Sequence, residues 1–407
     1  MTPDELADIY RDLHEHPELS YEEVRTAGIV AGQLTDLGFT VRTGVGGTGV
    51  VGVLENGDGP TVVLRADMDA LPVAEDTGLP YASTATVVSE DGARVPVMHA
   101  CGHDVHVTCL LGACSQLADD RGKWSGTIVA VFQQGEERAG ARRMIDAGLV
   151  DLIPNPTVVL GQHVAPLPAG LIGLAAGPAF AASDQVTVVM RGRGSHGSRP
   201  EASIDPIVMA AAVVMRLQTI VSREVSPVDE PAVVTVGQIF GGQKENIISD
   251  SATLKINVRS YSEDVRERVL ASIARIARGE AIASGATEEP IVEVSEESFP
   301  VLVNDADAVE RTVPALAASG AMVVDPGPVS GSEDVGMISD ALGVPIVYWL
   351  LGGLDPAEFV GASSVDEIKA RIADLPANHS PEFAPVIEPT LTNGVAALVA
   401  AAREWLG

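Results

Sequence analysis

The sequence is poor in lysine and rich in acidic residues. Its 407 residues include 26 lysines and arginines, only four of them lysines, against 56 aspartates and glutamates, so the formal net charge is −30. A surface that binds nucleic acid or an anionic membrane needs clustered cations. The charge balance therefore argues against both kinds of partner.

Cysteines and long apolar segments are also scarce. Three cysteines, an odd number in a long chain, do not make a disulfide framework. The acidic start Met1–Glu5 shows no export signal. No apolar stretch approaches the roughly 20 residues that span a bilayer. We therefore expect a globular protein of the reducing cytoplasm without a membrane partner.

Several common catalytic motifs are absent or stand in the wrong context. The sequence contains no Gly-x-Ser-x-Gly turn and no His-Glu-x-x-His zinc helix. The glycine-rich run 44–49 resembles a nucleotide-binding loop, but a predicted strand follows it instead of the helix that would hold a pyrophosphate. We interpret His14-Glu15-His16 as an ordinary helix end before Pro17.

Predicted strands and helices alternate along most of the chain, which indicates an α/β layer architecture. Between residues 181 and 297 the order becomes β-α-β-β-α-β, the pattern of ferredoxin-like domains. The length suits two or three domains at about 150 residues each. We predict an α/β domain of residues 1–180 and 298–407, with a central mixed sheet flanked by helices, and an inserted domain of residues 181–297.

Residues 98–106 carry the strongest local signal for chemistry. Cys101 and His103 are separated by one residue at the start of a predicted helix. A thiolate and an imidazole at this spacing can chelate one borderline cation, and a nearby carboxylate can orient the ring. A buried cysteine beside surface histidines is the alternative interpretation of this stretch alone.

Further donors follow predicted strands. Glu136 and Glu137 come directly after strand 127–132, where the sites of open α/β sheets gather. His163 follows an apolar run, and His379 lies in a predicted loop. A lone histidine is more often structural than a ligand, but together these side chains make a donor set for two cations. Two cations about 3.5 to 4 Å apart that share a water activate it and polarise a carbonyl, which is hydrolase chemistry.

Taken together, the motifs resemble those of the M20 family of metallopeptidases and amidohydrolases. The similarity is to the branch that hydrolyses N-acyl amino acids, hippurate and auxin conjugates. It implies a metal-binding α/β domain and an inserted domain that mediates dimerisation. The matching stretches follow the family's order along nearly the whole chain: 11–23, 64–72, 98–104, 132–137, 161–163, 194–200, 246–250, 331–334 and 378–383.

The resemblance also assigns roles to matching positions. It implies two divalent ions (Zn, Mn, Co or Ni) and Glu136 as the catalytic base. His196 and Asn246, from the inserted domain, match residues that hold the substrate, His196 often across the dimer. The implied metal ligands are Cys101, as the bridge, with His103, Glu137, His163 and His379.

Three more residues are expected to assist. Asp69 and Asp104 would orient metal ligands. Arg259 is a candidate partner for a substrate carboxylate, which needs local positive charge despite the acidic composition.

We therefore expect a metal-dependent amidohydrolase that cleaves N-acetyl, N-benzoyl or related amino acids, with Glu136 taking a proton from a water that bridges the metals. A homodimer or a tetramer is expected. The alternatives are a metal dipeptidase or aminopeptidase, and a non-catalytic binding protein of the same fold. Three departures from the family pattern leave the substrate preference open: Ser249, Val335 and the long stretch Ser83–Val97.

Overall fold

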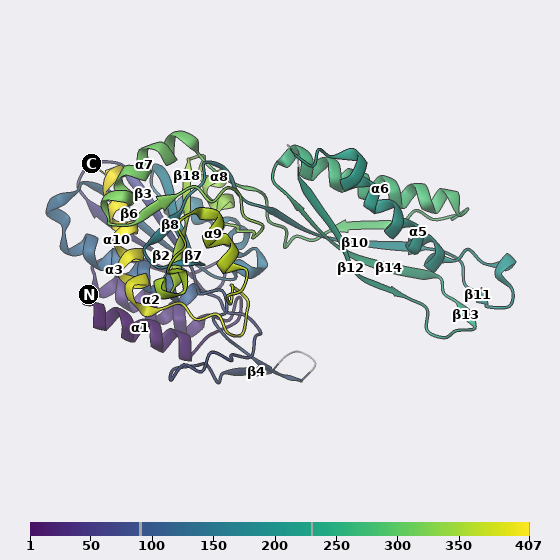
Figure 1. Ribbon diagram of the computed structural model, residues 1–407, viewed down its shortest axis with the longest axis horizontal. Coiled ribbons are helices and arrows are strands. Elements are labelled where there is room, and N and C mark those ends of the chain that lie inside the picture. The colour runs from purple at the N-terminus through teal and green to yellow at the C-terminus, as the bar shows by residue number, and fades with distance from the viewer. Residues whose placement is uncertain (89–91, 229–230, 407) are drawn as a thin grey trace. The chain divides into compact units, whose positions relative to one another are not determined.

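The chain divides into two units in a computed structural model that describes residues 1–88, 92–228 and 231–406 (Figure 1). Residues 89–91, within the long stretch Ser83–Val97, lie outside the described residues. The first unit comprises Met1–Ala179, Val303–Gly327 and Asp334–Gly407, and the second comprises Phe180–Leu302 and Pro328–Glu333.

An eight-stranded sheet forms the centre of the first unit. In spatial order its strands are β1 (Thr40–Val45), β2 (Gly49–Asn56), β6 (Gly126–Gln133), β3 (Thr61–Asp67), β7 (Pro156–Pro168), β18 (Ile346–Leu354), β8 (Leu171–Gly173) and β17 (Met322–Val324). The four central strands β6, β3, β7 and β18 are parallel to one another. The pairs β1–β2, β2–β6 and β8–β18 are antiparallel. The predicted mixed sheet is confirmed.

Helices pack against this sheet. The first begins with a capping box, in which the Thr2 hydroxyl accepts the Glu5 N–H and the Glu5 carboxylate accepts the Thr2 N–H. The helices of this unit are α1 (Pro3–Glu15), α2 (Val24–Asp36), α3 (His103–Asp119), α4 (Gly140–Asp146), α7 (Ala306–Ala318), α8 (Gly336–Leu342), α9 (Val365–Ile372) and α10 (Ile387–Leu406). Two short strands of this unit, β4 (Thr86–Val88) and β5 (Arg94–Pro96), form an antiparallel pair with each other.

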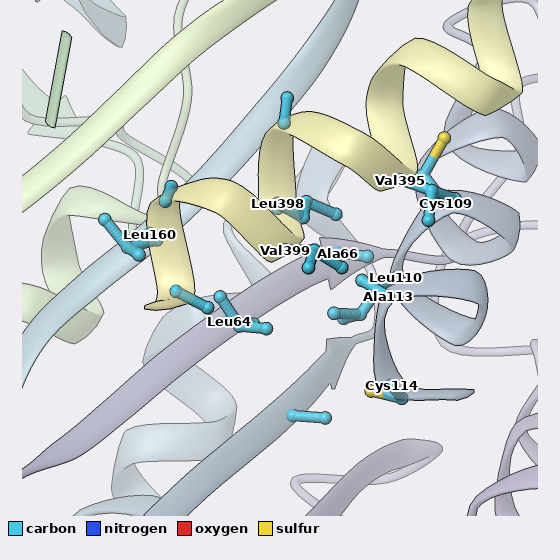
Figure 2. Close-up of a cluster of buried hydrophobic side chains, with 14 of the residues drawn as sticks. Leu64, Ala66, Cys109, Leu110, Ala113, Cys114, Leu160, Val395, Leu398 and Val399 are labelled. Atoms are coloured by element: carbon cyan, nitrogen blue, oxygen red, sulfur yellow. The ribbon is translucent and has the colours of Figure 1, made fainter. Parts of the chain in front are cut away.

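Strand β3 is buried along its whole length. Leu64 and Ala66 belong to the apolar core that also holds Leu110 of α3 and Leu398 of α10 (Figure 2). Because successive side chains of a strand point to opposite faces, Arg65 and Asp67 face the other side of the sheet. One strand thus supplies apolar residues to the core and buried charges to the opposite face.

The second unit is a four-stranded antiparallel sheet with two helices packed on it. Its strand order is β12-β14-β10-β15. The elements follow the chain as β10 (Ala182–Arg191), α5 (Pro206–Thr219), β12 (Ala232–Gly241), β14 (Ser251–Ser260), α6 (Glu263–Ala283) and β15 (Ile291–Val294). This confirms the predicted ferredoxin-like order. A shorter pair in this unit is β11 (Ser195–His196) with β13 (Ile247–Ile248). The pair β9 (Gly177–Phe180) with β16 (Leu302–Asn304) lies mostly in the first unit.

One helical segment corrects an expectation from the sequence. The segment Pro206–Glu224, which includes α5, is long enough and apolar enough to cross a membrane. These are criteria of length and composition only, and its mean hydropathy is 1.3. The expectation that no apolar stretch approaches the roughly 20 residues that span a bilayer was therefore wrong. One face of α5 packs on the sheet through Met209, Val213 and Leu217, and one such helix is weak evidence for a membrane span.

Two helical glycines are expected to respond oppositely to alanine. Gly394 of α10 packs against α3, and a Cβ there would lie 2.5 Å from Cys109 Sγ, whereas a Cβ on the exposed Gly28 of α2 meets nothing within 4 Å. Gly394→Ala should lower the unfolding free energy of the first unit by about 1–3 kcal/mol through overpacking. Gly28→Ala should raise it by up to about 1 kcal/mol through helix propensity. Thermal and urea unfolding would measure both, and equal effects of the same sign would contradict the packing at Gly394.

Candidate functional site

Potential metal donors gather where the central parallel strands end. Asp67 is the last residue of β3, Glu136 and Glu137 follow β6, and His163 lies on β7. Because these strands are parallel, their carboxyl ends meet at one edge of the sheet. His163 lies within its strand and not after it, since β7 continues to pair with β18 beyond Leu160 and places His163 opposite Leu350.

Cys101 and His103 reach this edge from the start of α3. The helix begins at His103, so this imidazole belongs to its first turn. Gly102 between them has a φ of 83°, a left-handed conformation that favours glycine. A Cβ at this position would also lie only 2.3 Å from Val164 Cγ1. Glycine therefore permits the close turn that carries both donors to β7.

The donor atoms form overlapping groups in which all atoms lie within 4.8 Å of one another. Cys101, His103 and His163 form one group, and Cys101, Glu137 and His379 form another. A third joins His103 with Glu136 and Glu137. The structure thus brings together all five predicted ligands and the predicted base, and Cys101 belongs to both of the first two groups.

The donor set fits divalent cations. Cys101 Sγ lies 3.5 Å from His163 Nε2, and His379 Nε2 lies 3.0 Å from Glu137 Oε1. The buried Nε2 of His103 has no hydrogen-bond partner among the described residues, and Asp67 Oδ2 is 3.8 Å away. Sulfur, imidazole and carboxylate donors at these spacings suit Zn²⁺ and similar ions. A buried imidazole nitrogen without a partner is what a metal ligand requires.

Burial and charge set the protonation of these donors in the metal-free chain. Burial, reinforced by Glu137 and Glu136, raises the pKa of Cys101 well above its usual value. Burial lowers the pKa of His163 to about 4. Burial also opposes a charge on His103, but Asp67, Asp69 and Glu137 outweigh it and raise its pKa to about 10. At neutral pH His163 is therefore neutral, while Cys101 and His103 carry protons.

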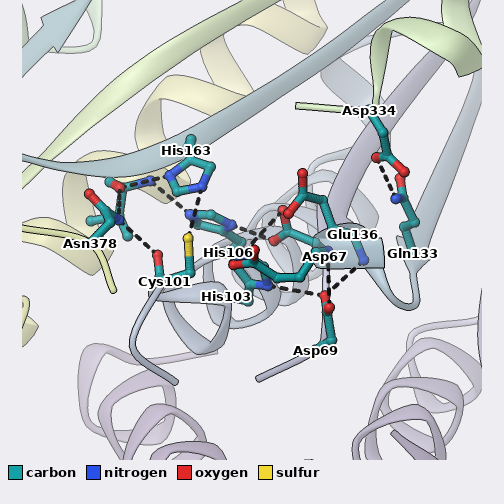
Figure 3. Close-up of polar contacts among 12 residues, drawn as sticks. Asp67, Asp69, Cys101, His103, His106, Gln133, Glu136, His163, Asp334 and Asn378 are labelled. Carbon is teal, nitrogen blue, oxygen red and sulfur yellow. Dashed lines mark hydrogen bonds and ion pairs between the residues drawn. The ribbon is translucent and has the colours of Figure 1, made fainter. Parts of the chain in front are cut away.

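Asp69 connects the donor segments (Figure 3). Its Oδ1 accepts hydrogen bonds from His103 Nδ1 at 3.2 Å and from the Glu136 amide at 3.0 Å. Its Oδ2 accepts the Glu137 amide at 3.2 Å and the Ser20 hydroxyl at 2.7 Å. This buried carboxylate fixes the ring of His103 and the turn that carries both glutamates.

Asp104 occupies a different position from the one expected. Its carboxylate lies 2.7 Å from His14 Nδ1, and His14 Nε2 lies 3.0 Å from Glu75. Burial would lower the pKa of His14, but its hydrogen bonds to Asp104 and Glu75 raise it to about 10. The residue interpreted as an ordinary helix end is therefore a buried cation that ties α1 to the first turn of α3.

Sequence reasoning assigned no role to His106 or Asn378. His106 Nδ1 donates to Asp67 Oδ1 at 2.5 Å, and its Nε2 accepts the Val164 amide at 2.7 Å (Figure 3). Asn378 donates from Nδ2 to the backbone oxygens of Cys101 and Val164, both at 3.0 Å. Both residues hold the backbone beside a donor. The available signals were the position of His106 in the segment 98–106 and that of Asn378 in the matching stretch 378–383, since their partners are distant in sequence.

Arg65 is a second buried charge that sequence reasoning missed. Its guanidinium donates to Asp67 at 2.7 Å, to Gln133 at 3.0 Å and to Asp334 at 3.3 Å. Gln133 in turn donates to Asp334 at 2.6 Å. Arg65 and Asp67 are two residues apart on one strand, so their side chains share a face of the sheet. This spacing could have indicated the pair.

The remaining predicted residues belong to the second unit. His196 lies on β11 opposite Ile247, and the Gly197 amide donates to the Asn246 backbone oxygen at 2.8 Å. His196 also borders a surface cavity beside Phe240. Arg259, on β14, donates to Asn257 at 3.2 Å and to the Ser332 hydroxyl. The second unit therefore brings His196 and Asn246 together and places a half-buried cation on its sheet.

Comparison with known proteins places the chain among relatives of one family. The model of peptidase family M20/M25/M40 matches residues 63–378. Thermostable carboxypeptidase 2 of Saccharolobus solfataricus is 37% identical over 86% of both chains. The N-acetyl-L-cysteine deacetylase of Bacillus subtilis is 36% identical, over 81% of this chain and 76% of the relative.

A solved structure extends the likeness to the whole fold. It is the Bacillus subtilis YXEP protein, described as a dinuclear metal binding peptidase from the M20 family. The match has a TM-score of 0.78 and 29% identity and covers 99% of this chain and 98% of the other. The chain therefore belongs to peptidase family M20/M25/M40, whose members are metal-dependent hydrolases of amide bonds.

Proposed function

We propose that this protein hydrolyses the amide bond of N-acyl amino acids and releases a carboxylic acid and a free amino acid. The observation that carries the proposal is the gathering of five metal donors in overlapping groups, one of which joins His103 and Glu137 with the buried Glu136. The relationship to an N-acetyl-L-cysteine deacetylase supports the choice of an acyl amino acid.

Two divalent cations would be held by Cys101, His103, Glu137, His163 and His379, with the Cys101 thiolate shared because it belongs to both donor groups. When bound, such a pair lowers the pKa of water and polarises a carbonyl. Zn, Mn, Co and Ni all suit these ligands, so metal analysis of the purified protein is needed to identify the native ion.

Glu136 acts as the general base and acid. Its carboxylate takes the proton of the attacking water and passes it to the leaving nitrogen. The hydrogen bond from its own amide to Asp69 fixes the turn from which it acts. His196 would stabilise the oxyanion that forms on the carbonyl, a contact that typically contributes a few kcal/mol. Asn246 and Arg259 would position the substrate and its carboxylate.

A peptide substrate is the second candidate. The relationship to a thermostable carboxypeptidase favours it. Amino-acid release from N-acetyl and N-benzoyl amino acids, compared with release from unblocked dipeptides and from longer peptides, separates the two. A kcat/KM that is higher for any peptide than for every acyl amino acid would overturn the proposal.

Replacing the base should remove activity and leave the metals in place. Glu136→Gln is expected to lower kcat by a factor of about 10² to 10⁴, the usual contribution of general acid–base catalysis. Metal analysis should still find two ions per chain, because Glu136 is not among the proposed ligands. Glu137→Gln is the matched control and should lose metal. A Glu136→Gln protein with two metals and most of its activity would refute the assignment.

Metal affinity should rise with pH. Cys101 and His103 are protonated in the metal-free chain at neutral pH, whereas His163 is already neutral. Binding must therefore displace about two protons, each of which raises the affinity about tenfold per pH unit. Competition titrations against a chelator between pH 6 and 8 measure the slope. Cys101→Ser should reduce it by about one proton, and a flat profile would contradict these protonation states.

We also propose that the protein forms homodimers through its second unit. Strand β12 lies at an edge of the four-stranded sheet and exposes Val233, Ile239 and Phe240. The neighbouring helix α5 exposes Val208 and Met215. An unpaired strand edge beside exposed apolar side chains favours pairing with a second copy of the same surface.

Charges on this surface should separate the subunits. Val208→Glu and Val233→Lys are expected to convert the dimer to monomers in sedimentation experiments at micromolar concentration. Ile282→Glu, at a still more exposed apolar position on α6, is the control and should leave the mass unchanged. A monomeric unmodified protein, or charged variants that keep the dimer mass, would contradict the proposed surface.

We also propose that the protein is cytoplasmic. Cys101, Cys109 and Cys114 are all free in the described structure. A reducing compartment keeps such thiols available, and this matters for Cys101 because the proposed metal centre needs its thiolate.

A further inference from the structure

The segment Glu18–Glu23 belongs to a motif that has no part in the proposed chemistry. It nevertheless lies against the catalytic edge of the first unit. The Glu18 backbone oxygen accepts the Ala70 amide at 2.8 Å, and the Ser20 hydroxyl donates to Asp69 at 2.7 Å. The segment is therefore held against the residues that follow β3.

Glu23 reaches from this segment to the turn before the proposed base. Its carboxylate is fully buried, and its Oε1 accepts the Gly135 amide at 2.7 Å and the Tyr21 amide at 2.9 Å. Its Oε2 accepts the Thr48 hydroxyl at 2.5 Å. Each carboxylate oxygen thus has a donor, and one of the donors is the amide of Gly135, the residue directly before Glu136.

Two buried carboxylates bind three successive amides of the same turn. The Gly135 amide donates to Glu23, and the amides of Glu136 and Glu137 donate to Asp69. The direction of these three peptide groups is therefore fixed from two separate segments of the chain. Asp69 binds only the amides of Glu136 and Glu137, so the Gly135 amide depends on Glu23 for its acceptor.

Tyr21 encloses the turn from its outer side. Gly135 has a φ of 58°, and a Cβ on it would lie 2.4 Å from Cε1 of the Tyr21 ring. The Tyr21 hydroxyl donates to the Arg138 backbone oxygen at 2.6 Å. The turn 135–138 therefore contacts both the Tyr21 side chain and the Glu23 carboxylate.

We propose that Glu23 is a positioning residue for Glu136, holding the Gly135 amide so that the following carboxylate points into the donor cluster. This inference rests on the proposed function insofar as Glu136 is the base. The Glu23 carboxylate binds Tyr21, Thr48 and Gly135, none of which is a proposed ligand, and it acts through the backbone of the turn.

The role requires hydrogen-bond acceptors and not a negative charge. Burial, helped by the charge of Asp69, raises the pKa of Glu23 to about 7, so a neutral side chain is readily accommodated here. A glutamine oxygen can accept the Gly135 and Tyr21 amides, and its amide nitrogen can donate to the Thr48 hydroxyl. An alanine supplies neither group.

The test compares Glu23→Ala and Glu23→Gln in the full-length, metal-loaded protein. Glu23→Ala should lower kcat for an N-acyl amino acid by about 10- to 100-fold, because a displacement of about 1 Å is enough for such losses. Its KM should change less than about threefold, and two metals should remain bound. Glu23→Gln should retain kcat within about threefold. Glu18→Ala is the control, since Glu18 caps α2 through the Arg25 and Thr26 amides without contacting the turn.

The outcomes separate the inference from the proposed function. Absence of hydrolysis by the unmodified protein counts against the function itself. An active unmodified protein whose Glu23→Ala variant keeps its kcat, or loses metal, overturns only the role of Glu23. An equal loss in the glutamine variant also overturns it. If Glu23→Ala does not fold, Glu23→Asp takes its place: a fall in kcat with an unchanged KM supports the role, and an unchanged kcat refutes it.

Discussion

The hydrogen bonds to Asp69 join three other segments of the chain at the candidate site. The carboxylate follows β3 and binds His103 from α3, two amides from the turn after β6, and Ser20 from the N-terminal segment. Burying a charge is costly unless it is fully paired. Burial raises the pKa of Asp69, but the hydrogen bond and charge of His103 and the hydrogen bond from Ser20 together outweigh it and keep the pKa below the usual value. A charged, fully paired Asp69 is the condition for the rest of the arrangement.

The same edge of the sheet concentrates negative charge. Asp67, Asp69 and Glu136 are buried there and Glu137 lies beside them, while Arg65 and the protonated His103 are the nearby cations. Divalent ions offset such a field locally, independently of the overall charge of −30. The acidic composition and the acidic site are therefore separate matters, since only a few of the carboxylates face the donor cluster.

The sequence was sufficient to predict the parts of the molecule that depend on local pattern. The β-α-β-β-α-β order of the second unit follows from element periods alone, and the donors stand in short motifs at strand ends. The contacts of Glu23, His14 and His106 were not predictable in this way. Each joins residues far apart in the chain, such as His14 with Asp104, and spacing alone does not show which buried side chains meet. The strand position of His163 was missed for the same reason, because β7 is extended by its pairing with β18.

The turn after β6 is held by contacts to its backbone amides, which nearly every residue type supplies. Glu23 and Asp69 both bind peptide groups of residues 135–137. The architecture of the turn and the chemical identity of the side chains it presents are therefore largely independent. A scaffold of this kind can exchange its reactive group in evolution and keep the geometry from which that group acts.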